Sequence, residues 1–166
     1  MLIVDGYNII GAWPQLRALK DQDRMDEARD LLIAKLAEYQ GFSGIKTIVV
    51  FDAYTVPGIG RTQKDFRIDV YFTKEKETAD EKIEKLVYEF FDKNRQIYVA
   101  TSDYTSQRVI FGQGALRKSA RELLLDIESI GKEIEKKVKS TQEDRFTKRI
   151  TLNEEIAKIF EKWRRE

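Results

Sequence analysis

The chain has 166 residues, of which 42% are hydrophobic and 36% are charged, and its 30 Lys and Arg residues nearly balance 29 Asp and Glu residues. This composition predicts a single globular domain over residues 1–166 and gives no sign of a polybasic tail, although a local basic patch would suffice to bind nucleic acid. The chain contains no Cys and no His, which excludes disulfide partners, thiolate chemistry, Ser-His pairs and most zinc sites.

The beginning of the chain lacks the basic and apolar regions of a signal peptide. No apolar run approaches the roughly 20 residues that a membrane-spanning helix needs. We therefore expect a cytoplasmic protein without a membrane partner.

The apolar residues follow two spacings along the chain. Short apolar runs predict strands at residues 2–4, 46–51, 67–72 and 97–101, with a further short strand at 108–111. Helical spacing predicts helices over residues 25–40, 78–91, 119–139 and 152–164, and the polar segment 140–149 is interpreted as a loop. Strands that alternate with helices in this way predict an α/β fold with a mainly parallel central sheet flanked by helices.

Capping boxes support three of the predicted helix starts. In each, a Ser or Thr is followed three residues later by Glu, the pattern in which each side chain bonds the other residue's backbone. The three pairs are Thr78 with Glu81, Ser119 with Glu122, and Thr151 with Glu154.

Aspartates follow the ends of three predicted strands. Asp5, Asp52 and Asp103 each come directly after or shortly after an apolar run, and Asp80 lies in the first turn of the helix predicted at 78–91. Ligands of open parallel sheets bind beyond the carboxyl ends of the strands, so these carboxylates are expected at one edge. Converging carboxylates repel one another unless a cation intervenes, and all-oxygen ligands suit Mg²⁺ or Mn²⁺. The sequence thus predicts a shared metal site.

Each aspartate also has a simpler interpretation. Asp5 fits an Asx turn, Asp52 fits a turn or a partner for Arg61 or Arg67, and Asp80 fits an acidic residue that complements the helix dipole. Asp103 fits the cap of a helix starting near Thr105. These interpretations stay open for the single residues, while the convergence of four carboxylates favours a metal site.

Several polar residues are weaker candidates for substrate binding. Asn8 suits either a turn or a contact to phosphate, and Ser102 suits either a local backbone bond or a contact near the site. Arg117, Lys118 and Arg121 are interpreted as opening a helix, where the dipole disfavours cations, so an anionic ligand and a solvated surface both remain open. Trp13 fits core packing better than base stacking.

The same motifs, taken together, resemble a known family. The run from Asp5 to Asn8, the segment Phe51-Asp52-Ala53, the segment around Asp80, the triplet that ends at Asp103, and residues 112–123 are similar to the YacP type of NYN domain. NYN domains belong to the PIN-like nucleases. The likeness covers nearly the whole chain.

The resemblance implies a PIN-like (NYN) three-layer fold and a Mg²⁺- or Mn²⁺-dependent acidic centre. It places Asp5, Asp80 and Asp103 at the catalytic and metal-binding positions and Asp52 at a further acidic position. Asn8 and Ser102 match the polar positions beside them. The motifs are similar to those of the bacterial endonuclease that cuts messenger RNA in the ribosomal A site, so RNA and the ribosome are the expected partners.

Two other functions compete with this one. A PIN-like module that binds RNA or the ribosome without cutting RNA would keep the fold and lose the metal. A metal-dependent phosphatase often carries an Asp-x-Asp nucleophile motif after its first strand, and Asp5-Gly6-Tyr7 does not provide one. The intact set of four carboxylates favours the nuclease.

Overall fold

The computed structural model describes residues 1–52, 68–74, 76–92, 95–102, 112 and 114–163, with side chains as far as residue 141. Two compact units divide the chain, residues 1–127 and residues 128–166. The strands are β1 (Leu2–Asp5), β2 (Thr47–Phe51), β3 (Asp69–Phe72), β4 (Tyr98–Ala100) and β5 (Leu116–Lys118). The helices are α1 (Gly6–Ala12), α2 (Pro14–Asp21), α3 (Met25–Ser43), α4 (Ala79–Phe90) and α6 (Ala120–Trp163).

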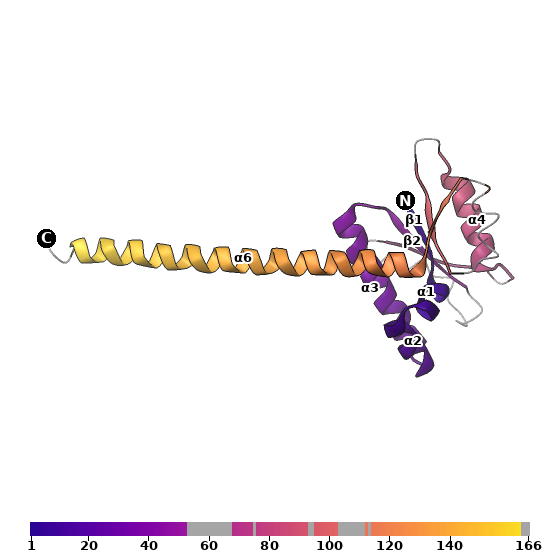
Figure 1. The fold of residues 1–166 in the computed structure, drawn as a ribbon, viewed down its shortest axis with the longest axis horizontal. Helices are drawn as coiled ribbons and strands as arrows, with labels where there is room; N and C mark the ends of the chain where they lie inside the picture. Colours follow the sequence, from indigo (N-terminus) through magenta and orange to yellow (C-terminus); the bar gives the residue numbers. More distant parts are fainter. Residues whose placement is uncertain (53–67, 75, 93–94, 103–111, 113, 164–166) are drawn as a thin grey trace. The chain divides into compact units, whose positions relative to one another are not determined.

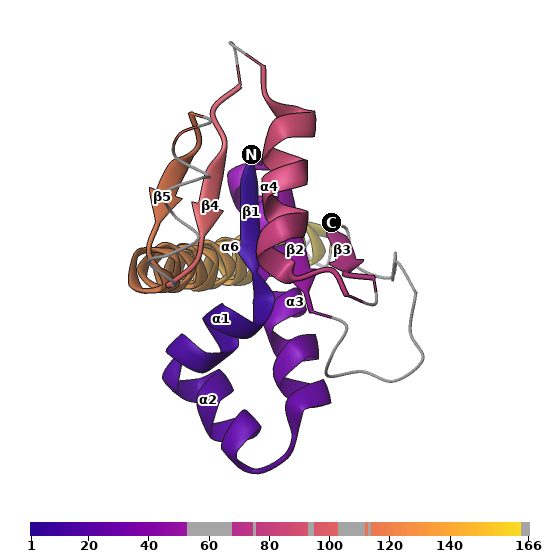
Figure 2. The same ribbon diagram turned by 90° about the vertical axis from the view of Figure 1, so that its right-hand side faces the viewer.

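The first unit contains a five-stranded sheet in the order β3-β2-β1-β4-β5, and every neighbouring pair is parallel. Figure 2 shows β1 running from the N-terminus toward α1, with β4 and β5 on one side of it and β2 and β3 on the other. Because all strands are parallel, their carboxyl ends share one edge, which we call the carboxyl edge. The predicted α/β class with a parallel sheet between helices is confirmed.

One face of the sheet packs against α4. The shared hydrophobic core joins Ile3 and Val50 of the sheet to Ile83 and Val87 of the helix. Figure 1 shows α4 on this side and α3 on the opposite side, where α3 contacts β2. Both faces are therefore covered, as parallel sheets require.

Most predicted elements are confirmed within two or three residues, but several predictions are wrong or incomplete. Residues 140–149 are helical, so the predicted loop and the helix start at Thr151 are replaced by the single helix α6. This segment has no Gly or Pro and many good helix formers, and its polar character does not interrupt a helix. Strand β5 and helices α1 and α2 were not predicted, while the expected strand at 108–111 lies outside the described residues.

Arg117 and Lys118 belong to strand β5, so the expectation that they open a helix is wrong. Strand β5 (Leu116–Lys118) lies at the edge of the sheet, where charged side chains are common. It is a strand because it pairs with β4 and not because its own residues favour strand formation. Arg121 does lie in the first turn of α6, and the capping box of Ser119 with Glu122 is present.

No described helix combines the length and the apolar composition needed to cross a membrane. In the second unit, α6 continues to Trp163. Val138 is half exposed there.

Gly6, the first residue of α1, lies against the ring of Phe51. A Cβ atom at Gly6 would come within 2.2 Å of Phe51 Cε1. The ring is fully buried and stacks on Phe72 with a centroid distance of 5.6 Å, so it has little room to move. The absence of a side chain at Gly6 therefore lets α1 begin directly beside the end of β2.

We expect Gly6→Ala to lower the free energy of unfolding by about 1–3 kcal/mol, the usual penalty for overpacking a core. Gly11→Ala in the same helix is the matched control, because nothing lies within 4 Å of its added Cβ, and it should be neutral or stabilising by up to about 1 kcal/mol. Denaturant unfolding measures both. Equal stability of the Gly6→Ala variant and the wild type would contradict the close contact.

Candidate functional site

Asp5 is both the last residue of β1 and the N-cap of α1. Its Oδ1 atom accepts a hydrogen bond of 3.1 Å from the backbone N–H of Asn8, and only 8% of the residue is exposed. Asp5 therefore has a local backbone role, as a helix N-cap whose bond comes from the residue three positions on rather than as the predicted Asx turn. The capping bond is made by one carboxylate oxygen, and a carboxylate has several acceptor positions, so capping is compatible with binding a cation.

Asn8 joins the start of α1 to the segment after β4. Its Oδ1 atom accepts a hydrogen bond of 2.7 Å from the backbone N–H of Ser102, and the Ser102 hydroxyl donates to the same atom. Ser102 directly precedes Asp103, which lies outside the described residues. Asn8 thus links the Asp5 cap to the chain leading to Asp103. Direct substrate contacts by Asn8 and Ser102 stay predictions.

Asp52 directly follows β2 and contacts the end of β3. The hydroxyl of buried Thr73 donates to Asp52 Oδ1 at 3.3 Å, and the Thr73 backbone N–H donates to the carbonyl of Phe51 at 3.0 Å. These two bonds fix the end of β2 against the end of β3. The alternative partners Arg61 and Arg67 lie outside the described residues.

Asp80 is the second residue of α4, in the first turn as predicted. The helix starts at a complete capping box, in which Thr78 accepts from the Glu81 N–H and Glu81 accepts from the Thr78 N–H. Since α4 follows β3 and runs back along the sheet, its first turn lies at the carboxyl edge (Figure 2).

Alternation along the strands indicates the face on which the carboxylates lie. Ile3 and Val50 face α4, and side chains two residues apart in a strand share a face. Asp5 and Asp52 therefore extend the α4 face at the carboxyl edge, where α4 contributes Asp80. Three elements thus bring three of the four predicted carboxylates to the same end and the same side of the sheet.

The donor chemistry of this site fits Mg²⁺ or Mn²⁺, because carboxylate, amide and hydroxyl groups supply only oxygen ligands. Among the described residues, no three acidic side chains approach closely enough to form a complete metal-binding group. Asp103, the fourth predicted carboxylate, lies outside the described residues. The residues present therefore suit the cation without forming the whole site.

Lys118 is held by neighbours within the protein. Burial alone would lower its pKa, but the contacts with Asp126 and Tyr39 outweigh burial and raise the pKa above its ordinary value. Its ammonium group also lies 5.8 Å from the ring centroid of Tyr98. Arg117 and Arg121 are exposed, and RNA contacts by all three cations stay predictions.

Two structural contacts at this edge carry no clear signal in the sequence. The Arg29 Nη1 atom of α3 donates to the Tyr7 hydroxyl at 2.9 Å, across 22 residues of chain. Gly6 lies against Phe51, as described above, although the two are far apart in the sequence.

Trp13 packs in the core, as the sequence favoured. Its side chain is almost completely buried, with 2% of the residue exposed, and its Nε1 atom donates a hydrogen bond to the Ala120 carbonyl.

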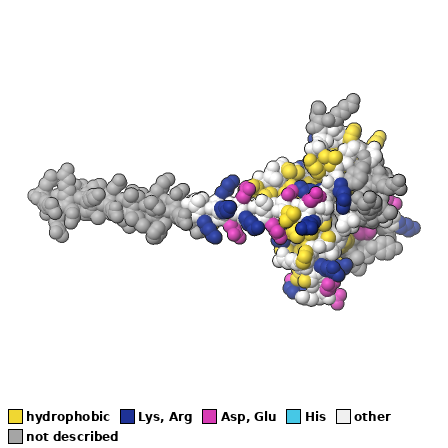
Figure 3. Space-filling model, viewed as in Figure 1, with side chains coloured by type: hydrophobic (Ala, Val, Ile, Leu, Met, Phe, Trp, Pro, Cys, Tyr) yellow, Lys and Arg dark blue, Asp and Glu magenta, His cyan; other side chains and the backbone are white. Residues whose placement is uncertain are grey.

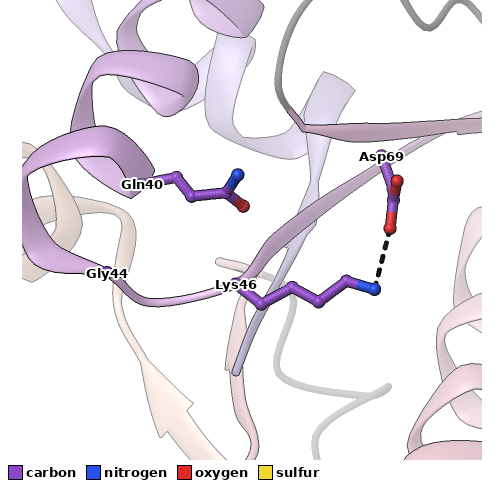
Figure 4. Close-up of a pocket in the computed structure, with 4 residues that line it drawn as sticks. All are labelled: Gln40, Gly44, Lys46 and Asp69. Atoms are coloured by element: carbon purple, nitrogen blue, oxygen red, sulfur yellow. Dashed lines mark ion pairs between the residues drawn. The ribbon is translucent and has the colours of Figure 1, made fainter.

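A pocket of about 290 Å³ lies at the other edge of the sheet, between the end of α3 and the starts of β2 and β3 (Figure 4). Lys46 and Asp69 form an ion pair of 3.1 Å there, and Gln40 Oε1 accepts from the Thr47 N–H. Its charged groups pair with each other, and the candidate carboxylates lie at the opposite edge. We therefore do not assign the function to this pocket.

Comparison with known proteins supports the interpretation of these motifs. The family model of the YacP-like NYN domain matches residues 2–165. A Bacillus subtilis protein named "Uncharacterized protein YacP" is 56% identical over 165 residues, covering 99% of this chain and 96% of the relative.

Solved structures give the same result. The crystal structure of Rae1 (YacP) from Bacillus subtilis matches with a TM-score of 0.79 and 55% identity, over 100% of this chain and 95% of that chain. The crystal structure of a Trp-to-Leu mutant of the same protein matches with a TM-score of 0.75 and 55% identity, over 85% and 82% of the two chains. Sequence and structure agree over nearly the whole length, and the chain belongs to the YacP-like NYN domain family.

Proposed function

We propose that this protein is a metal-dependent endoribonuclease that cuts messenger RNA, with the ribosomal A site as the place of cleavage. The observation that supports the proposal is that Asp5, Asp52 and Asp80 lie on elements that end or begin at the carboxyl edge, on the side of the sheet covered by α4, in a chain of the NYN family. NYN domains are PIN-like, and membership is consistent with a nuclease. The ribosome and the identity of the RNA rest on the resemblance of the motifs, and the cytoplasm is the proposed location.

Asp5, Asp80 and Asp103 are the proposed ligands of Mg²⁺ or Mn²⁺, and Asp52 is a further acidic residue beside them. A divalent cation held by carboxylates supplies Lewis-acid chemistry to a phosphodiester and favours attack by water. Asn8 holds the Asp5 cap and the Ser102 backbone in place, which orients two of the three ligand-bearing segments.

The chain has no His to activate a ribose 2′-hydroxyl. Attack by water is therefore the mechanism that its residues favour, and in-line attack leaves a 5′-phosphate and a 3′-hydroxyl. Arg117, Lys118 and Arg121 are candidates for contacts to the RNA backbone.

A binding module that recognises RNA or the ribosome without cutting RNA is the second candidate. The observation in its favour is that the described residues contain no complete group of three acidic side chains. The two functions differ in whether activity depends on the carboxylates and on a cation.

We expect discrete mRNA cuts in a reconstituted translation reaction, mapped by primer extension, and no cuts with Asp5→Asn. Asp69→Asn is the matched control, because it makes the same change at the opposite edge of the sheet, and it should cut like the wild type. Cuts without ribosomes would indicate a general endoribonuclease. The absence of cuts from the wild type on several messages would favour the binding module.

The two roles of Asp5 can be separated by two substitutions. Asparagine caps helices as well as aspartate, so Asp5→Asn should keep or raise the metal-free melting temperature, whereas Asp5→Ala should lose about 1 kcal/mol of stability. Both variants should lose cleavage, because neither keeps the carboxylate. A large drop in melting temperature with Asp5→Asn would instead indicate a structural role for the charge.

Removal of divalent cations with EDTA should abolish cleavage, and Mg²⁺ or Mn²⁺ should restore it. The new RNA ends should be a 5′-phosphate and a 3′-hydroxyl, as tested by ligation and by phosphatase sensitivity. A 2′,3′-cyclic phosphate, or full activity in EDTA, would contradict the proposed chemistry.

A further inference from the structure

Arg29 places a cation of low exposure beside the candidate site. Its side chain is only 12% exposed, and its Nη1 atom donates to the Tyr7 hydroxyl at 2.9 Å. The hydroxyl is a neutral acceptor, so it orients the guanidinium without balancing its charge. A guanidinium removed from water in this way is stabilised by an anion.

The anion beside Arg29 is exposed to solvent. The Arg29 Nη2 atom forms an ion pair with Asp26, whose side chain is 86% exposed and lies three residues earlier in the same helix. An exposed carboxylate loses little when it leaves such a pair, because water replaces the cation. Arg29 therefore keeps an anion-binding position that a stronger ligand can take over.

The contacts of Tyr7 tie this position to the carboxyl edge. Tyr7 follows Asp5 by two residues, and its ring lies edge-on to the ring of Phe51 at a centroid distance of 5.2 Å. Phe51 directly precedes Asp52. Successive strand residues face opposite sides, so Phe51 points away from the face that Val50 and Asp52 share. Arg29 thus approaches the carboxyl edge from one face of the sheet while the carboxylates lie on the other.

The face shown in Figure 3 has no large cluster of Lys and Arg side chains among the described residues. On the face shown in Figure 3, the described Lys and Arg side chains are interspersed with Asp and Glu. On this face, a polyanion would therefore meet individual cations among the described residues rather than a continuous basic patch. Guanidinium suits this task because it binds phosphate oxygens through two parallel N–H bonds.

We propose that Arg29, oriented by the Tyr7 hydroxyl, binds a backbone phosphate of the RNA where the strand crosses the carboxyl edge, on the face of the sheet opposite the carboxylates, and that Asp26 occupies this position until RNA displaces it. The inference rests on the proposed function, since it assumes an RNA substrate at the carboxyl edge. It adds a binding residue outside the motifs that define the candidate site.

The test measures RNA affinity in the Asp5→Asn background, so that the RNA stays intact in the presence of Mg²⁺. The probes are a fluorescent single-stranded RNA oligonucleotide, followed by anisotropy, and mRNA-programmed ribosomes, followed by co-sedimentation. Arg29→Gln should weaken binding by about tenfold and reduce the salt dependence by the slope of one phosphate contact, about 0.7 for a single strand.

The start of α3 offers a matched control for each member of the ion pair between Arg29 and Asp26. Arg24 and Glu27 form an exposed ion pair with the same spacing of three residues, so Arg24→Gln should leave the slope and the affinity almost unchanged. Asp26→Asn removes the competing anion and should tighten binding by about two- to fivefold, as expected for an exposed ion pair. Glu27→Gln should not tighten it.

Three outcomes would overturn the inference. Arg29→Gln and Arg24→Gln with the same affinity and slope would make Arg29 a structural residue that joins α3 to α1. An unchanged affinity with Asp26→Asn would show that Asp26 does not compete with RNA, and this variant decides the question if Arg29→Gln fails to fold. Failure of the Asp5→Asn parent to bind either probe would overturn the proposed function, and this inference with it.

Discussion

The contact between the Gly6 backbone and the Phe51 ring sets the geometry of the carboxyl edge. Because Gly6 has no side chain, the first turn of α1 starts directly beside the end of β2. Asp5 directly precedes Gly6 in the chain, and Asp52 directly follows Phe51. The contact between Gly6 and Phe51 therefore helps to set the positions of both carboxylates. The ring in turn stacks on Phe72, which joins the end of β3 to the arrangement. An apolar contact thus contributes to the position of the candidate site.

Hydrogen bonds at the carboxyl edge also hold the candidate residues in position. Asn8 connects the Asp5 cap to Ser102, and Thr73 connects Asp52 to the end of β3. The bonds of Asn8 to Ser102 and of Thr73 to Asp52 join segments that are distant in sequence and adjacent in the sheet. The backbone N–H of Asn8 and the hydroxyl of Thr73 thus help to hold the carboxylates of Asp5 and Asp52 in place.

The sequence was sufficient to predict the parallel sheet, the helices α3 and α4, and the placement of Asp5, Asp52 and Asp80 at one edge, because buried strands and capping boxes have local signatures. It did not predict β5, whose strand character depends on pairing with β4 rather than on the residues Leu116–Lys118. The polar segment 140–149 was predicted to be a loop but is helical. A solvent-exposed helix and a loop can both have a polar sequence, so polarity alone does not distinguish them.

The side-chain contacts of the site were beyond sequence reasoning for a different reason. The bond between Arg29 and Tyr7 and the approach of Gly6 to Phe51 join distant positions that no periodicity relates. The motifs of the family mark which residues meet, but they carry no information about the neighbours that hold them in place.

The cap that Asp5 forms on α1 also has an evolutionary consequence. Asparagine accepts the same backbone hydrogen bond, and an aspartate codon becomes an asparagine codon by a single base transition. One such change would remove a charge from the acidic edge while preserving the start of the helix. Under the function proposed above, a single mutation would therefore give a folded descendant without cleavage activity, so gene duplicates of this fold could diverge in function before they diverge in structure.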